Sequence, residues 1–523
     1  MSLARAMGTI GGLTLVSRIF GFARDMLLAR ILGAGLAADC FQLAFRLPNT
    51  FRRLFAEGAF SAAYVPMFSR ALQGPGGHDE AERFSQDVLS VFVPVLIGFT
   101  ALFELGMSGF VWLLANDFQQ VPGKFELAVT LSRIAFPYLF FISIVSLLTG
   151  ILNSLSRFAA GAAAPILFNL TLISGLLFGS WLRGPDGSDL VIAYVQSGAV
   201  ALSGFVQLVW LWYWTKKSGF RLTIRRPVFT PQVRELGRII LPATFGAGIY
   251  QISQLVDTFF ATRLPQGSLT HLAMADRLNQ MPLGVIGIAL GTAILPALSR
   301  HIAREDEGGA SKVQSDAIEL AMLLTLPAAV ALMVCAGPFV SAFFVGGRFT
   351  PEDGIITSQV VIALVAGLPA YVLVKLLTPG FFARKDTKTP VKTALVVLIF
   401  NIAVILVVIG PFGIVGLASA TAAASWLNCA LLYSIQHKRG HYRLHAKLLL
   451  RLGRQLIAAA VMAAALFAAR DPLLPYFAGG VIERAVSVLA LVLAGVTVYF
   501  ATAWAIGAID RDRIAILQRK KAL

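Results

Sequence analysis

The sequence predicts an all-α polytopic membrane protein with about 14 transmembrane helices, arranged as two six-helix parallel repeats around a central cavity plus two extra C-terminal helices. Three observations lead to this prediction. The 523 residues are 57% hydrophobic and only 14% charged, with a mean hydropathy of +0.76. Long apolar segments recur along the whole chain, and a short motif returns after about 230 residues. This composition is too apolar for a soluble domain of the same length.

The apolar segments are each long enough to cross a hydrocarbon core of about 30 Å. We expect helices at 8–33, 36–67, 88–114, 126–152, 159–182, 189–214, 237–262, 271–298, 316–345, 354–378, 390–410, 414–436, 450–469 and 482–508. Arg18 and Arg24 interrupt the first segment, which also lacks a convincing cleavage site. We therefore expect the N-terminus to be retained rather than removed as a secretory signal.

Positive charge is concentrated on one side of this predicted topology. The net charge is +17. Loops after the even-numbered segments, together with both termini, hold roughly 29 lysines and arginines, whereas the opposite loops hold about five. The positive-inside rule then predicts that both termini are cytoplasmic. It also explains the basic isoelectric point, so we expect attraction to membrane lipids and no nucleic-acid partner.

An internal repeat sets the domain organisation. The motif at 66–70, Pro-Met-Phe-Ser-Arg, returns as Pro-Ala-Leu-Ser-Arg at 296–300, and prolines at 137 and 165 have counterparts at 369 and 390. Because six helices are an even number, the second half re-enters the bilayer in the same orientation as the first. We expect an N-terminal lobe at 1–215, a basic cytoplasmic linker at 216–236, a C-terminal lobe at 237–436, and two further helices with a basic tail at 437–523.

Charged side chains inside the predicted spans point to a solvated cavity. Each Arg, Lys or Asp near the centre of a membrane helix costs roughly 2.5 to 3.5 kcal/mol, so four cost about 10 to 14 kcal/mol unless they face water, a partner or a ligand. Arg18 and Asp25 are seven residues apart and share one face of a helix. The same spacing relates Asp39, Arg46 and Arg53 in the second segment, and Glu57 follows four residues later.

Both halves contribute such charges, because Asp276, Arg277 and Lys375 lie in the second repeat. The cavity should be net cationic, with Arg18, Arg24, Arg52 and Arg277 as the strongest candidates for binding an anion. A planar guanidinium suits bidentate contact with phosphate or carboxylate. The implied ligand is a phosphate ester.

Two alternatives stay open for individual charges. Arg24 could simply pair with Asp25, and Arg277 with Asp276, so that the pairs hold helices together. Asp257, inside a helix beside Gln254 and Thr258, could bind a cation such as sodium or could be a hydrogen-bonded structural carboxylate.

No enzyme signature is present. All six histidines lie in predicted loops or at helix ends, the three cysteines are far apart, and the sequence contains no metal-ligand spacing, nucleophile elbow or P-loop. We expect no enzymatic activity and no cofactor. Any uphill transport must then use an ion gradient such as sodium, the membrane potential, or consumption of the product.

Several of these residues carry a resemblance to the MurJ/MviN family of the multidrug/oligosaccharidyl-lipid/polysaccharide exporter superfamily. The matching stretches are 17–25, 47–49, 52–60, 275–278, 287–296 and 388–390, and the likeness extends over nearly the whole chain. The resemblance implies a lipid II flippase of the bacterial inner membrane, which moves the undecaprenyl-pyrophosphate-linked peptidoglycan precursor outward by alternating access. It also implies a role in cell-wall biogenesis and contact with peptidoglycan-synthesis machinery.

The resemblance further implies which residues serve the cavity. These are Arg18, Arg24, Asp25, Asp39, Asn49, Arg52, Glu57, Asp276, Arg277 and Lys375. It implies that the last two helices form a groove for the polyprenyl tail, and that a sodium site around helices 7, 11 and 12 is matched here in part by Asp257. Three other functions remain as alternatives: a flippase for another polyprenyl-linked glycan of O-antigen type, a cation-coupled drug exporter, and a non-transporting membrane scaffold.

Overall fold

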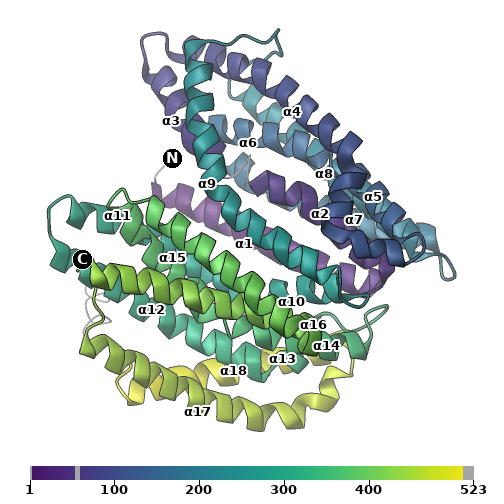
Figure 1. Cartoon of the computed structure of the whole chain (residues 1–523), viewed down its shortest axis with the longest axis vertical. Coiled ribbons are helices and arrows are strands. Elements are labelled where there is room, and N and C mark those ends of the chain that lie inside the picture. The colour runs from purple at the N-terminus through teal and green to yellow at the C-terminus, as the bar shows by residue number, and fades with distance from the viewer. Residues whose placement is uncertain (1–2, 54–58, 510–523) are drawn as a thin grey trace. The chain divides into compact units, whose positions relative to one another are not determined.

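The computed structural model describes residues 3–53 and 59–509. Helices account for nearly all the secondary structure of these residues, and no β-strand occurs among them, so the all-α prediction is confirmed (Figure 1). The chain forms two compact units. The first contains Met1–Thr270 and Gly347–Phe349, and the second contains His271–Gly346 and Thr350–Leu523.

The first unit extends from α1 to the first turn of α10. Its elements are α1 (Leu3–Leu32), α2 (Leu36–Arg52), α3 (Ala59–Gln73), α4 (Gly77–Ala115), the 3₁₀ turn η2 (Asn116–Gln120), α5 (Lys124–Ala135), α6 (Tyr138–Ser154), α7 (Phe158–Arg183), α8 (Asp189–Lys217), α9 (Pro231–Ala261) and α10 (Ser268–Pro282). Helix α7 packs against both α1 and α8, while α2 packs against α5 and α8. The charged helices α1 and α2 are therefore supported by apolar neighbours.

The second unit contains the remainder of α10 and the C-terminal helices. After α10 come the π-helical turn η3 (Leu283–Gly287), α11 (Ile288–Ile302), α12 (Glu307–Val334), α13 (Ala336–Phe343), α14 (Pro351–Val365), α15 (Leu368–Phe382), α16 (Lys388–Lys438), α17 (Ala446–Phe477) and α18 (Val481–Ala505). Helix α17 packs on α12 and on α18, and α18 also contacts α13. The two extra C-terminal helices thus form a pair attached to one side of this unit.

Several helices that we predicted as continuous are broken. The span 126–152 divides into α5 and α6, with Pro137 at the N-cap of α6. The span 354–378 divides into α14 and α15 at Gly367, just before a proline in the first turn of α15. A proline has no amide proton to continue the preceding helix, which explains both breaks. The spans 271–298 and 316–345 are likewise divided, into α10, η3 and α11 and into α12 and α13.

The prediction of two helices at 390–410 and 414–436 is confirmed. The segment Lys388–Lys438 carries the single label α16, but its backbone is not helical at Gly413 (φ 51°, ψ −130°), so two helices meet there. Within the described residues, nine helical stretches have the length and hydropathy to cross a membrane. Helices α1 (30 residues) and α9 (31 residues) are also long, and they carry charged residues discussed below. The predicted number of 14 spans is not confirmed by this criterion.

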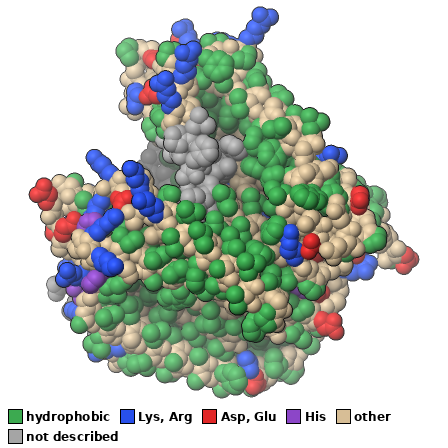
Figure 2. All heavy atoms as spheres, in the orientation of Figure 1, with side chains coloured by type: hydrophobic (Ala, Val, Ile, Leu, Met, Phe, Trp, Pro, Cys, Tyr) green, Lys and Arg blue, Asp and Glu red, His purple; other side chains and the backbone are tan. Residues whose placement is uncertain are grey.

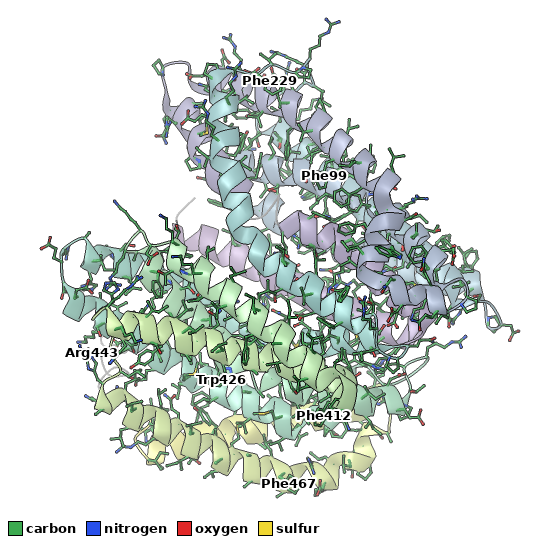
Figure 3. The ribbon with its side chains drawn as sticks, in the orientation of Figure 1. Phe99, Phe229, Phe412, Trp426, Arg443 and Phe467 are labelled. Carbon is green, nitrogen blue, oxygen red and sulfur yellow. The ribbon has the colours of Figure 1, made fainter. Side chains whose placement is uncertain are left out.

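Hydrophobic side chains cover much of the surface seen in Figure 2. Phe412 on α16 and Phe467 on α17 are exposed large hydrophobic residues, as is Trp426 (Figure 3). A soluble protein rarely exposes apolar area on this scale. The surface therefore agrees with helices that face lipid.

The predicted basic linker at 216–236 is fixed to the first unit rather than free. Residues 218–230 are not helical, and they lie along the start of α4. The Arg221 amide donates to Glu82 Oε2 at 3.0 Å, and the Val228 amide donates to Ser90 Oγ at 3.1 Å. Helix α9 belongs to this same unit, whereas our predicted C-terminal lobe began at residue 237.

A short segment between α13 and α14 also belongs to the first unit. The Arg348 amide donates to the Arg30 carbonyl at the end of α1, at 2.8 Å. Gly33 follows α1 with φ +71°, and a Cβ there would lie 2.6 Å from the Arg348 carbonyl oxygen. Only glycine fits this combination of backbone conformation and close approach.

Candidate functional site

Arg24 and Asp25 form a buried ion pair in the C-terminal third of α1. Their exposed fractions are 6% and 4%. Arg24 Nε and Nη2 both donate to Asp25 Oδ1, at 3.0 and 2.7 Å. The pairing that we considered as an alternative is therefore present. Because the two residues are adjacent in one helix, however, this pair does not join α1 to another helix.

Other helices complete the surroundings of the Arg24 guanidinium. Asn169 on α7 accepts a hydrogen bond from Arg24 Nη1 through Oδ1, at 3.0 Å. The guanidinium carbon lies 5.5 Å from the ring centroid of Phe168 and 5.9 Å from that of Phe45. Such distances allow cation–π attraction, which grows when the cation is removed from water. We call these four partners, Asp25, Asn169, Phe168 and Phe45, the Arg24 cradle.

The remaining predicted arginines of the first unit are more accessible than Arg24. Arg18 lies on an exposed part of α1. Arg52, half-buried in the last turn of α2, donates from Nε to Asn49 Oδ1 at 3.1 Å. The structure thus brings Asn49 and Arg52 together, as their position in one polar stretch suggested. Glu57 lies outside the described residues.

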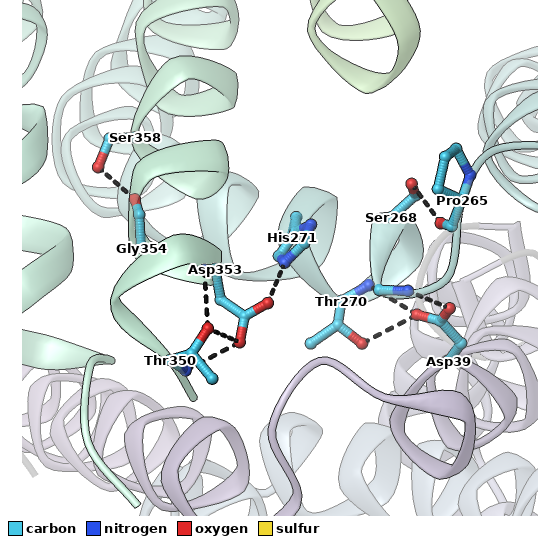
Figure 4. A network of polar contacts seen from close by, with 10 residues as sticks. Asp39, Pro265, Ser268, Thr270, His271, Thr350, Asp353, Gly354 and Ser358 are labelled. Carbon is cyan, nitrogen blue, oxygen red and sulfur yellow. Dashed lines mark hydrogen bonds and ion pairs between the residues drawn. The ribbon is translucent and has the colours of Figure 1, made fainter. Parts of the chain in front are cut away.

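Asp39 caps the start of α10 (Figure 4). Its Oδ2 accepts from the Gly267 amide at 2.7 Å, and its Oδ1 accepts from the amide and hydroxyl of Thr270 at 3.3 and 3.1 Å. Lys124 Nζ lies 3.7 Å from Oδ2, and Asp39 is only 2% exposed. A carboxylate in this position satisfies unpaired amides at a helix N-terminus. Its substrate contact remains a prediction.

The polar face that we predicted on α2 exists and is directed at α9. Arg46 Nη1 donates to Thr258 Oγ1 at 2.9 Å. One heptad further along α2, Arg53 Nη1 donates to Gln254 Oε1 at 3.4 Å. Two arginines on one face of α2 therefore meet polar residues one turn apart on α9.

These contacts bear on the predicted sodium site. Asp257 lies between Gln254 and Thr258 on α9, but the oxygens of those two neighbours already accept hydrogen bonds from arginines. A sodium ion would have to compete with two guanidinium groups, which disfavours this set of donors as a cation site. Among the described residues there is also no cluster of three or more His, Cys, Asp or Glu that could hold a metal.

The second unit holds the other predicted site residues. Asp276 and Arg277 are half-buried on α10, where Asp276 Oδ1 accepts a hydrogen bond from Gln280 at 3.3 Å. Lys375 is half-buried on α15. Close to Asp276 in sequence, His271 Nε2 contacts Asp353 Oδ1 at 2.9 Å, and Asp353 forms a capping box with Thr350 at the start of α14 (Figure 4). This second network stabilises helix ends within the unit.

A cavity of about 300 Å³ lies near the Arg24 cradle, between α1, α6 and α7. Its lining is largely apolar, and Thr14, Ser17, Thr149 and Asn153 are among its polar members. Ser17 also connects the cavity wall to the cradle, because its carbonyl accepts a hydrogen bond from Asn169 Nδ2 at 3.1 Å.

Sequence analysis missed Asn169, Phe45 and Phe168. A signal for Asn169 was present, since an amide side chain in the otherwise apolar α7 needs a buried partner. Nothing in the sequence separates Phe45 and Phe168 from the other 36 of the chain's 38 phenylalanines. Their role depends on packing that only the folded structure shows.

Comparison with known proteins agrees with this architecture. A family model described as "Lipid II flippase MurJ" matches residues 28–503. The "Probable lipid II flippase MurJ" of Rhizobium meliloti (strain 1021) is 41% identical over 510 residues, which cover 97% of this chain and 94% of that protein.

Solved structures extend the comparison to the fold. One described as "Lipid II flippase MurJ, inward closed conformation" aligns with a TM-score of 0.76 at 23% identity, covering 97% of this chain and 99% of the other. An inward-facing MATE-family multidrug transporter aligns with a TM-score of 0.64 at 16% identity, covering 82% and 97%. At these identities the two structures support the fold alone.

Proposed function

Because the chain belongs to the lipid II flippase MurJ family, we propose that it moves lipid II from the cytoplasmic to the periplasmic leaflet by alternating access. It is a multi-pass membrane transporter and not an enzyme. The observation in the structure that best supports the proposal is the Arg24 cradle. It holds a guanidinium inside an apolar helix bundle, paired with a carboxylate of its own helix.

The cradle suits the binding of a pyrophosphate. Arg24 is neutralised by Asp25 before a ligand binds, which lowers the cost of holding a cation away from water. An incoming phosphate can share or replace Asp25, and its charge-assisted hydrogen bonds are strong in a site with few water molecules. Arg18, Arg52, Arg277 and Lys375 would supply further positive charge to the headgroup. Asp25, Asp39, Asn49, Arg53, Glu57 and Asp276 would orient these groups.

The other functions are less well supported. An exporter of organic cations needs carboxylates that are available to the drug, but Asp25 is paired with Arg24 and Asp39 caps α10 next to Lys124. A scaffold does not need a buried guanidinium. A flippase for another polyprenyl-linked glycan would use the same cradle, so the substrate must be tested directly.

The energy source remains a proposal. An inside-negative potential favours outward movement of an anion by about 2.3 kcal/mol per charge per 100 mV, so a headgroup of charge near minus two gains roughly 4 to 5 kcal/mol. Coupling to sodium through Asp257 would need donors other than Gln254 and Thr258, and we derive no transport step from it.

We also propose that both termini are cytoplasmic, in the bacterial inner membrane. The strongly basic 218–230 segment and the loop at 383–387 would then face the cytoplasm, where peptidoglycan-synthesis enzymes that make lipid II are predicted partners. In intact cells an impermeant thiol reagent should label Asp186→Cys and should not label Arg304→Cys. The reverse pattern would invert this topology.

The function is tested by the fraction of lipid II exposed on the outer face of intact cells, measured with an added enzyme that cleaves its pyrophosphate linkage. Depletion of this protein should leave lipid II protected, and Arg24→Ala as the sole copy should do the same. If exposure persists after depletion in cells without a second flippase, lipid II is the wrong substrate. Another polyprenyl-linked glycan then becomes the leading candidate.

A further inference from the structure

We propose that Asn169 on α7 is a positioning residue: its amide sets the orientation in which the Arg24 guanidinium receives the anionic headgroup. The proposal rests on the proposed function, since it takes Arg24 as a headgroup ligand. Asn169 lies outside the set of residues that the sequence pointed to, and it carries no charge of its own.

Both the oxygen and the nitrogen of the Asn169 side-chain amide form hydrogen bonds. The residue is 5% exposed. Oδ1 accepts from Arg24 Nη1 at 3.0 Å, and Nδ2 donates to the Ser17 carbonyl at 3.1 Å. The opposite orientation of the amide would put its NH₂ against a guanidinium and its oxygen against a carbonyl. The two partners therefore select one orientation of Asn169, and that orientation presents an acceptor to Arg24.

Helix α1 is shaped to receive this amide. Ser17, Gly21 and Arg24 follow one face of the helix, four and three residues apart. A Cβ placed on Gly21 would lie 3.5 Å from Asn169 Nδ2 and 3.6 Å from Oδ1. The amide thus lies across the helix face at the glycine, between its two hydrogen-bonding partners. An alanine at position 21 would make only ordinary van der Waals contact, whereas a leucine would displace the amide.

Two different groups hold two different edges of the guanidinium. Asp25 accepts from Nε and Nη2, and Asn169 accepts from Nη1. Phe168, the neighbour of Asn169 on α7, contributes its ring to the same cation. A long arginine side chain has many rotamers, so fixing its plane in advance reduces the entropy lost when a ligand binds.

There is a chemical reason for an uncharged side chain at position 169. A carboxylate there would hold Arg24 equally well, but it would add a second negative charge beside Asp25 and repel a pyrophosphate. An amide orients the guanidinium and leaves its attraction for an anion in place. Asparagine is therefore the side chain expected of a group that positions a cation for an anionic ligand.

A purely structural role makes different predictions. Helix α7 already packs closely on α1, so Asn169 could merely add one more tie between them. Loss of such a helix–helix contact would change the affinity for every ligand of the protein alike. A positioning residue should affect only affinity that depends on the negative charge of the ligand.

The experiment compares two ligands of the full-length protein in nanodiscs: lipid II, and undecaprenol, which has the same tail and no pyrophosphate. Asn169→Leu should weaken lipid II binding about tenfold and leave undecaprenol binding within a factor of two. Thr171→Val is the matched control, because the Thr171 hydroxyl donates to the Leu167 carbonyl of its own helix. This control should bind both ligands as the wild type does.

A second measurement tests whether Asn169 acts through Arg24. In an Arg24→Lys background, Asn169→Leu should change lipid II affinity less than twofold, because the group that it positions is absent. The proposal is overturned if Asn169→Leu leaves lipid II affinity unchanged, weakens both ligands equally, or keeps its full effect in the Arg24→Lys background. If the wild type does not prefer lipid II to undecaprenol, the proposed function fails instead.

Discussion

Two buried arginine–carboxylate pairs in this protein have different geometries. Arg24 and Asp25 are adjacent in α1, and both arginine donors reach a single carboxylate oxygen. Arg451 on α17 and Glu319 on α12 are 132 residues apart, and Arg451 Nη1 donates to both oxygens at 2.9 and 2.8 Å. The second pair joins two helices, which the first cannot do.

The Arg451–Glu319 pair stabilises the packing of two helices, whereas the Arg24–Asp25 pair keeps a cation available for a ligand. A long-range ion pair with low exposure, 14% and 11% here, fixes helices relative to each other. The Gln455 amide also donates to the Glu319 carbonyl, which strengthens the attachment of α17. A pair of neighbours along one helix adds little to tertiary structure. The presence of the Arg24–Asp25 pair inside the membrane is better explained by a ligand that binds the arginine.

The largest expected effect comes from removing the cradle's cation. Arg24→Ala should lower the rate of lipid II translocation at least a hundredfold, a loss of about 3 kcal/mol in transition-state stabilisation. Because Arg24→Ala alone leaves the Asp25 carboxylate buried without its cation, stability is compared with the double variant Arg24→Ala with Asp25→Ala, which should unfold close to the wild type. Translocation by reconstituted vesicles and thermal unfolding in detergent measure the two quantities.

Breaking the Arg451–Glu319 pair should instead lower the stability of the protein. Arg451→Met leaves the Glu319 carboxylate buried without its cation and should lower the free energy of unfolding by up to about 3 kcal/mol. The double variant Glu319→Leu with Arg451→Leu should recover most of that loss, because no unpaired charge remains. Unfolding by denaturant compares the three proteins, and equal instability of the single and double variants would contradict this role.

Asp39 should show an intermediate effect, because it stabilises a helix end rather than a helix–helix contact. Asp39→Ala removes the acceptor for the Gly267 and Thr270 amides and should cost about 1 to 3 kcal/mol in folding stability. Hydrogen exchange at those two amides should rise. Unchanged protection would mean that other acceptors replace the carboxylate.

The smallest effect is expected outside the membrane, at the loop between α15 and α16. The Thr389 hydroxyl and amide and the Arg439 guanidinium hold the pKa of Asp386 well below its usual value. A lowered pKa means that this stabilisation is complete above the ordinary carboxyl pKa of about 4 and is lost as the pH falls further. For this partly exposed group it should amount to no more than about 1 kcal/mol.

Asp386→Asn checks that prediction. It should lower stability slightly at pH 7, and the difference from the wild type should shrink below about pH 4, where the carboxylate of the unfolded chain begins to protonate and the native one is still charged. A difference that stays constant with pH would show that the carboxylate's charge is not responsible.

Much of the fold could be predicted because burial in a membrane imposes a simple rule on the sequence. Each span must be apolar and long, so hydropathy located most of the helical segments, although it did not show where they are divided. The helix breaks at Pro137 and Gly367 could not be predicted in this way, because they depend on local backbone geometry inside a continuous apolar stretch. The break at Gly413 in α16 was predicted, since it falls between the spans 390–410 and 414–436.

The site was predictable to the extent that charge is costly in lipid. This cost singled out Arg24 and Asp25 from the sequence, and their burial confirms that they lie away from water. The cost does not say which partner each charge has. Asp39 contacts the start of α10, and Asn169 on α7 contacts Arg24 on α1. Both contacts join segments far apart in sequence, so only the folded structure shows them.

The most direct test of the contrast is the dissociation constant of lipid II for two proteins, Arg24→Ala with Asp25→Ala, which leaves no unpaired charge, and Arg451→Met. Each is measured on folded protein beside its thermal unfolding curve. We predict that the Arg24/Asp25 double variant loses binding and keeps its stability, while Arg451→Met loses stability and keeps its binding. If the double variant binds lipid II like the wild type, or unfolds as early as Arg451→Met, the Arg24 cradle is a structural pair and the proposed headgroup site is wrong.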